Sequence, residues 1–128
     1  MSGHKVLFDT NAVGFYLDDE KFAKKYLKAN TAISISIITQ LEFLSNPELT
    51  AKNRFIFDEF VDYVEIYPVT RENKELVMQV VSIRKKYKLK LPDAIIAATA
   101  IINNATLFSA DDVFSKIFNL KFEIIKYA

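Results

Sequence analysis

The chain has 128 residues, 51% of them hydrophobic, and a formal net charge of +1. We expect one domain covering residues 1–128, because this length and hydrophobic content suit a single core. The sequence has no cysteine and one histidine, which argues against disulfide scaffolds, thiolate or multi-histidine zinc sites and catalytic triads. Two glycines are too few for a phosphate-binding glycine loop.

The start of the chain shows no basic segment followed by an apolar leader. The longest uncharged run, residues 94–110, is shorter than the roughly 20 residues of a membrane-spanning helix and is interrupted by Asn103 and Asn104. We therefore expect a soluble cytoplasmic protein that does not associate with a membrane.

The hydrophobic pattern predicts alternating strands and helices along the whole chain. In chain order these are strand 5–8, one or two helices in 15–29, strand 32–37, helices 38–45 and 47–63, strand 64–69, helices 70–87 and 92–104, strand 106–108, a short helix 111–118 and strand 122–126. Strand 64–69 is expected at a sheet edge, because Pro68 cannot donate a hydrogen bond. Helix 92–104 is apolar on nearly every side, so we expect it to be buried.

Strands separated by helices indicate an α/β protein with a parallel sheet covered on both faces. The expected architecture is a three-layer α/β/α sandwich with a central, mainly parallel sheet of about five strands. In such a sheet, ligands bind beyond the carboxyl ends of the strands.

Four acidic residues are expected at that end of the sheet. Asp9 follows the first strand, and Glu42 lies about one turn into the helix after the second. Asp93 is in the first turn of the buried helix, and Asp111 follows the fourth strand. Carboxylates without histidine suit a hard cation such as Mg²⁺ or Mn²⁺.

Three of these acids also have a purely structural interpretation. Asp9 or Thr10 could cap a helix. Asp93 could favour the helix dipole, and Asp111 could be a bystander in a capping-box spacing. Glu42 has apolar neighbours on both sides, in ITQLEFL, so its charge calls for a partner or an ion.

The sequence resembles the PIN-domain ribonucleases, especially the small VapC-type toxins of toxin–antitoxin systems. The matching segments are FDTN with Asp9, TQLEFL with Glu42, LPDAIIAATA with Asp93 and TLFSADDVF with Asp111. They cover essentially the whole chain in order. Family members often carry another acid two residues after the last one, where this chain has Val113. Asp112 is acidic but out of register.

The resemblance implies a metal-dependent ribonuclease that uses Mg²⁺ or Mn²⁺ to cleave RNA phosphodiester bonds. Asp9, Asp93 and Asp111 would hold the metal, and Glu42 would be a ligand or orient water. Residues that would orient these groups are Thr10, Asn11 and Ser109, with Asp112 as a further candidate. Family members are usually homodimers. The toxins are inhibited by an antitoxin helix, and a groove around residues 15–60 would suit it.

A basic segment leads directly into Asp93. Its members are Arg84, Lys85, Lys86, Lys88 and Lys90. They could bind RNA phosphates, or they could serve the dipole of a helix C-terminus and solubility.

Two other functions compete with an active ribonuclease. A haloacid-dehalogenase-like phosphatase also begins with an aspartate after its first strand, but it needs a second acid where this chain has Asn11. A PIN fold that binds RNA or a protein partner with little catalysis is the other alternative, supported by the valine at position 113.

Overall fold

The structure is a computed structural model that describes residues 4–126. The elements in chain order are β1 (His4–Phe8), α1 (Thr10–Asp18), α2 (Phe22–Tyr26), β2 (Thr31–Ser36), α3 (Ile37–Ser45), α4 (Ala51–Val61), β3 (Glu65–Tyr67), α5 (Lys74–Tyr87), α6 (Leu91–Ile102), β4 (Thr106–Ser109), the 3₁₀ helix η1 (Asp112–Lys116) and β5 (Phe122–Ile124). The strands form one sheet in the order β3-β2-β1-β4-β5, and every neighbouring pair is parallel.

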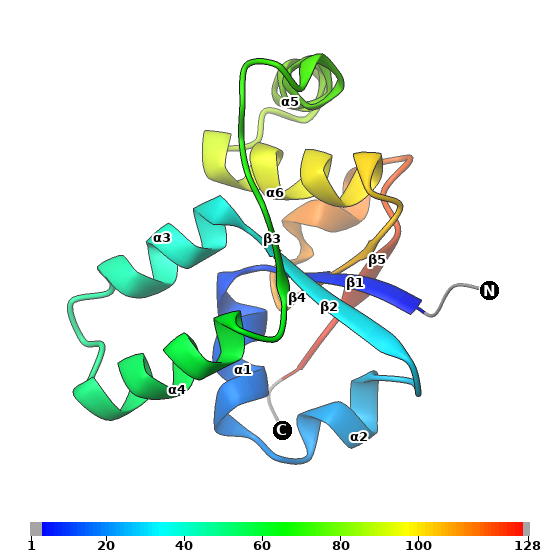
Figure 1. Cartoon of the computed structure of the whole chain (residues 1–128). Helices are drawn as coiled ribbons and strands as arrows, with labels where there is room; N and C mark the ends of the chain where they lie inside the picture. The colour runs from blue at the N-terminus through cyan, green and yellow to red at the C-terminus, as the bar shows by residue number, and fades with distance from the viewer. Residues whose placement is uncertain (1–3, 127–128) are drawn as a thin grey trace.

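The sheet lies between two layers of helices. In Figure 1, α5 and α6 cover one face, and α1, α2 and α4 lie on the other. The predicted three-layer α/β/α fold with a five-stranded parallel sheet is therefore confirmed, and β3 occupies the edge predicted from Pro68.

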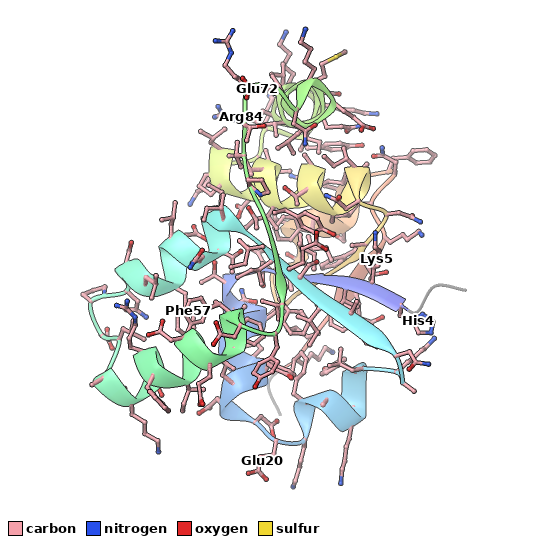
Figure 2. All side chains as sticks on the ribbon, in the orientation of Figure 1. His4, Lys5, Glu20, Phe57, Glu72 and Arg84 are labelled. Atoms are coloured by element: carbon pink, nitrogen blue, oxygen red, sulfur yellow. The ribbon has the colours of Figure 1, made fainter. Side chains whose placement is uncertain are left out.

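Alternating side chains of the central strand supply the two cores. Leu7 packs with Leu107 and the buried face of α6 on one side of the sheet. Val6 and Phe8 pack on the other side with aromatic residues of α2 and α4. Among these, Phe57 of α4 lies between α4 and α3, stacked on Phe43 with ring centroids 4.3 Å apart (Figure 2).

Several helices begin directly after a residue whose side chain caps the helix N-terminus. The first helix begins at Thr10 rather than Phe15, because Asp9 caps it. Asp18 is the last residue of α1, and Glu20 projects from the turn before α2 (Figure 2). Similarly, Thr50 caps α4 and Asn73 caps α5, so both helices start later than the periodicity predicted.

Helix α6 is buried, as its apolar composition predicted. Seven of the residues of α6, from Ala94 to Ala100, are buried. None of the helices within residues 4–126 has the length and apolar character needed to cross a lipid bilayer.

Candidate active site

Asp9 stands where β1 ends and α1 begins. Its carboxylate Oδ1 accepts a hydrogen bond of 3.0 Å from the backbone N–H of Ala12, so it is the N-cap of α1. The side chain is nevertheless buried, with 6% of the residue exposed. The structural and functional interpretations of Asp9 are thus compatible, because capping the helix uses only part of the capacity of a carboxylate, whose two oxygens can each accept more than one contact.

The environment of Asp9 opposes its charge. Its pKa is raised from 3.8 to about 6, chiefly by burial and to a smaller extent by repulsion from Asp111 and Asp93. Hydrogen bonds from the Ser109 hydroxyl and the Ala12 N–H act in the opposite direction. A carboxylate in these surroundings is stabilised when it binds a proton or a cation.

Asp93 lies in the first turn of α6 and is half-buried. Its pKa is also raised, first by burial and then by repulsion from Asp111 and Glu42, whereas the charge of Lys90 lowers it. Because Asp9 and Asp93 each experience the neighbouring acids, the structure brings all four predicted carboxylates to one end of the sheet.

Glu42 has the partner that its apolar sequence context called for. The Thr10 hydroxyl donates a hydrogen bond of 2.6 Å to its Oε1. This bond joins α1 to α3, and it leaves Glu42 exposed to solvent rather than enclosed. The side chain is therefore held in place at the mouth of the site.

Ser109 links two acid-bearing segments. This buried residue ends β4, and its hydroxyl oxygen accepts a hydrogen bond of 2.9 Å from the Asp111 N–H while supporting the carboxylate of Asp9. Asn11 makes a similar link, since its Oδ1 accepts a bond of 3.1 Å from the Ala110 N–H. Both residues tie the loop after β4 to the start of α1.

Asp111 is exposed, and its Oδ1 caps η1 by accepting a bond of 3.0 Å from the Val113 N–H. Val113 packs against the core on the α5 and α6 side of the sheet. Its side chain thus fills apolar space instead of adding a carboxylate. Asp112 is exposed in the first turn of η1.

The donor set suits a hard divalent cation. All four candidates are carboxylates, and within residues 4–126 none of them forms an ion pair with lysine or arginine. The carboxylates share one end of the sheet, but no three acidic or histidine side chains in this part of the chain are close enough to form a ready-made metal site. Charge therefore fits a cation, and the ligands would have to draw together around it.

The basic segment is divided between structural and open positions. Arg84 donates through Nε to the Leu89 carbonyl at 3.3 Å, and Lys88 adopts a left-handed conformation with φ of 57° that ends α5. Lys90 precedes Asp93 and is the member that affects the acids. Lys85 and Lys86 are exposed in the last turn of α5.

The structure shows one unusual polar residue near the acids that the sequence analysis did not single out. Thr39 of α3 is completely buried, and its hydroxyl oxygen has no hydrogen-bond partner within residues 4–126. It precedes Glu42 by three positions, so both lie on one side of α3. The only sequence signal was a threonine in an apolar helix.

A groove of about 570 Å³ opens beside the acids between α1, α3 and α4. Thr10, Asn11 and Glu42 line one end, and Phe15, Leu17 and Ile56 supply apolar walls. The aromatic residues of α4 divide as expected for a helix against a core, because Phe57 and Phe60 are buried whereas Phe55 is 64% exposed.

Comparisons with known proteins agree with this geometry. The family model described as PIN domain matches residues 6–119. No curated protein matches the chain by sequence. The chain is similar to a solved structure of VapBC2 from Rickettsia felis bound to a DNA fragment from their promoter, with 23% identity, a TM-score of 0.78 and coverage of 95% of this chain and 99% of that one.

Two further solved structures show the same fold. A toxin–antitoxin complex from Klebsiella pneumoniae has 28% identity and a TM-score of 0.73, covering 90% of this chain and 94% of that one. DNA-bound VapBC from Salmonella typhimurium has 18% identity and a TM-score of 0.75, covering 95% and 98%. With the family model spanning most of the sequence, the chain belongs to the PIN-domain family, whose members are nucleases.

Proposed function

We propose that this protein is a metal-dependent ribonuclease and the toxin of a toxin–antitoxin pair. One observation carries the enzymatic part of the proposal. Four carboxylates share the carboxyl end of a parallel sheet, and burial and mutual repulsion raise the pKa of Asp9 and Asp93, neither of which forms an ion pair within residues 4–126. Such an arrangement is costly for folding and is expected where a cation acts.

In this proposal Asp9, Asp93 and Asp111 hold Mg²⁺ or Mn²⁺. A bound divalent ion would neutralise the carboxylates and stabilise the charge that develops on a phosphate during hydrolysis. Glu42, held by Thr10, would be a further metal ligand or would orient the attacking water. Ser109 and Asn11 hold the loop that carries Asp111 against the start of α1. The carboxylates of Asp9 and Asp111 therefore keep their positions relative to each other. Asp112 stays a further candidate at the edge of the site.

The groove between α1, α3 and α4 supports an antitoxin partner. It has apolar walls, and its rim carries the acidic residues Asp18, Glu42 and Glu48. An amphipathic helix with a basic side chain would match both features. The similar structure from Klebsiella pneumoniae is a toxin–antitoxin complex, which supports the same kind of partner here.

A homodimer is part of the proposal as well. The outer face of α5 exposes Val77, Met78 and Val81 to solvent, with Lys85 nearby. Three adjacent apolar side chains on one helix face support contact with a second copy of the chain.

Cleavage of a panel of single-stranded, hairpin and transfer RNAs tests the enzyme. With Mg²⁺ or Mn²⁺ the protein should cut RNA, and EDTA should stop it. Asp93→Asn should lower the rate by more than about a hundredfold, since losing even a group that supports a metal ligand costs roughly 10- to 100-fold. Asp62→Asn at the end of α4 removes an equivalent charge outside the acidic cluster and should have no effect.

Other outcomes separate the alternatives. Full activity of both Asp9→Asn and Asp93→Asn would contradict the assigned site. RNA binding without cleavage by well-folded protein would favour a binding module. A phosphatase is disfavoured because Asn11 is an amide whose oxygen is already bonded to the Ala110 N–H; trapping an aspartyl-phosphate would reverse that conclusion.

A further inference from the structure

The end of α5 and the loop after η1 contact each other outside the acidic cluster. The backbone N–H of Phe118 donates a hydrogen bond of 3.1 Å to the hydroxyl of Tyr87. Tyr87 ends α5, a few residues before Asp93, and Phe118 follows η1, a few residues after Asp111. The bond therefore places the basic segment beside the loop that follows η1.

Phe118 is displayed to solvent on a fixed backbone. It is 91% exposed, more than any other large hydrophobic residue within residues 4–126. Its neighbours Ile117 and Leu120 are buried in the core, and its own N–H is bonded to Tyr87. The ring thus contributes almost no burial to the fold, although the main chain that carries it is anchored.

Lysines lie on the two segments that carry this ring and its partner Tyr87. Lys86 lies over the Tyr87 ring, with Nζ 5.4 Å from its centroid. Lys88 and Lys116 are exposed on the two segments that the Tyr87 hydrogen bond joins. Within residues 4–126 no acidic side chain forms an ion pair with any of these lysines. The ring and the three lysines are called the Phe118 patch below.

Resting on the proposed ribonuclease function, we propose that the Phe118 patch binds single-stranded RNA outside the acidic site. A base stacks on Phe118, and phosphates contact Lys86, Lys88 and Lys116. Exposed aromatic rings with lysines bind single strands in this way, because every base has a face that can stack and every linkage carries a charge. Paired RNA keeps its bases stacked inside the helix, so the patch should prefer unpaired strands.

Charge favours RNA over a protein partner at this place. A protein-docking surface would have apolar neighbours around Phe118, as on α5, whereas this ring is accompanied by lysines.

Fluorescence anisotropy with a short, labelled single-stranded RNA of mixed sequence, measured in EDTA to prevent cleavage, tests the inference. Phe118→Ala should weaken binding by about 5- to 150-fold, the range for losing one base–aromatic stack. Phe118→Trp should restore binding, because tryptophan also stacks. Tyr63→Ala is the matched control, since Tyr63 is 87% exposed at the end of α4 and should not matter.

Salt dependence distinguishes stacking from charge. Lys86→Ala should reduce the slope of log affinity against log salt by about one phosphate contact, whereas Phe118→Ala should leave the slope unchanged. Inorganic polyphosphate has charge but no bases, so it should bind the unmodified protein and the Phe118→Ala variant with the same affinity.

Each result supports or overturns the inference. If the unmodified protein binds and cleaves RNA, and Phe118→Ala binds the labelled strand equally well, the patch is not an RNA site and the ribonuclease proposal still stands. If the unmodified protein neither binds nor cleaves any RNA, both proposals fail. A changed oligomeric state of Phe118→Ala in size-exclusion chromatography, with unchanged RNA affinity, would make Phe118 a protein contact.

Discussion

Asp9 stabilises one part of the fold and destabilises another. As the N-cap of α1 it satisfies the Ala12 N–H, which favours the helix. As a buried carboxylate near Asp93 and Asp111 it also carries a charge that the fold resists. The net cost of Asp9 in metal-free protein therefore depends on pH, and its sign can be predicted.

In EDTA, stability should fall as pH rises between about 4 and 6. In the unfolded chain Asp9 loses its proton near its ordinary pKa, whereas the folded protein keeps it up to about 6. The folded state thus binds more protons in this interval, and the loss amounts to roughly 3 kcal/mol once pH exceeds the folded pKa.

Asp9→Asn removes this dependence and keeps a good N-cap. At pH 7 without metal, the variant should therefore be more stable than the unmodified protein, with a flatter pH profile between pH 4 and 6. Urea unfolding at several pH values measures the difference. Parallel profiles for the two proteins would show that Asp9 is not buried as a charged group.

The sequence predicted which acids would lie together, but not the side-chain contacts between them. Topology predicted that Asp9, Glu42, Asp93 and Asp111 would share one end of the sheet. The hydroxyl of Ser109, placed between Asp9 and the Asp111 N–H, depends on how β4 registers with β1, with Leu107 opposite Leu7. Side-chain distances of this kind follow from strand register, which hydrophobic periodicity does not specify.

At the scale of elements, α1 contains a glycine that the fold does not need. Gly14 is in the middle of the helix, and an added Cβ would meet no atom within 4 Å. The same residue lines the groove beside the acids. A bare stretch of helix there lets a partner approach the backbone closely, and helix stability is lower as a result.

Gly14→Ala should raise the free energy of unfolding by about 0.5–1 kcal/mol, the usual difference between the two residues inside a helix. Urea unfolding measures it. Ser82→Ala on the exposed face of α5 is a control for propensity alone and should give a smaller gain. A loss of stability in Gly14→Ala would mean that α1 packs more tightly than the structure shows.

The bounds of the strands were easier to predict than the start of the first helix. All five strands were predicted near their observed positions, because alternation and β-branched residues are local signals. The first helix was predicted to begin at residue 15 and begins at Thr10, although Asp9 and Thr10 were both considered as helix caps. The hydrogen bond from the Ala12 N–H shows that Asp9 is the cap.

At the scale of the whole molecule, a divalent cation should stabilise the fold. Ions that bind the folded acids and not the unfolded chain add about 2.7 kcal/mol at a hundredfold excess over the dissociation constant. Thermal unfolding with Mn²⁺ should shift upward for the unmodified protein and much less for Asp93→Asn. Equal shifts in the two proteins would place the bound ion away from the acidic cluster.

The strand order has a consequence for when the protein can act during its synthesis. The first strand, β1, lies at the centre of the sheet and pairs with β4, in which each partner residue comes 100 positions later in the sequence. Such distant pairing forms slowly and needs the residues between the two strands. Asp9 gains Asp93 and Asp111 as neighbours only when the chain as far as β4 and the residues after it has been made. A nascent chain that has not reached Asp111 therefore lacks an assembled acidic site, so nuclease activity should begin only after that point of synthesis.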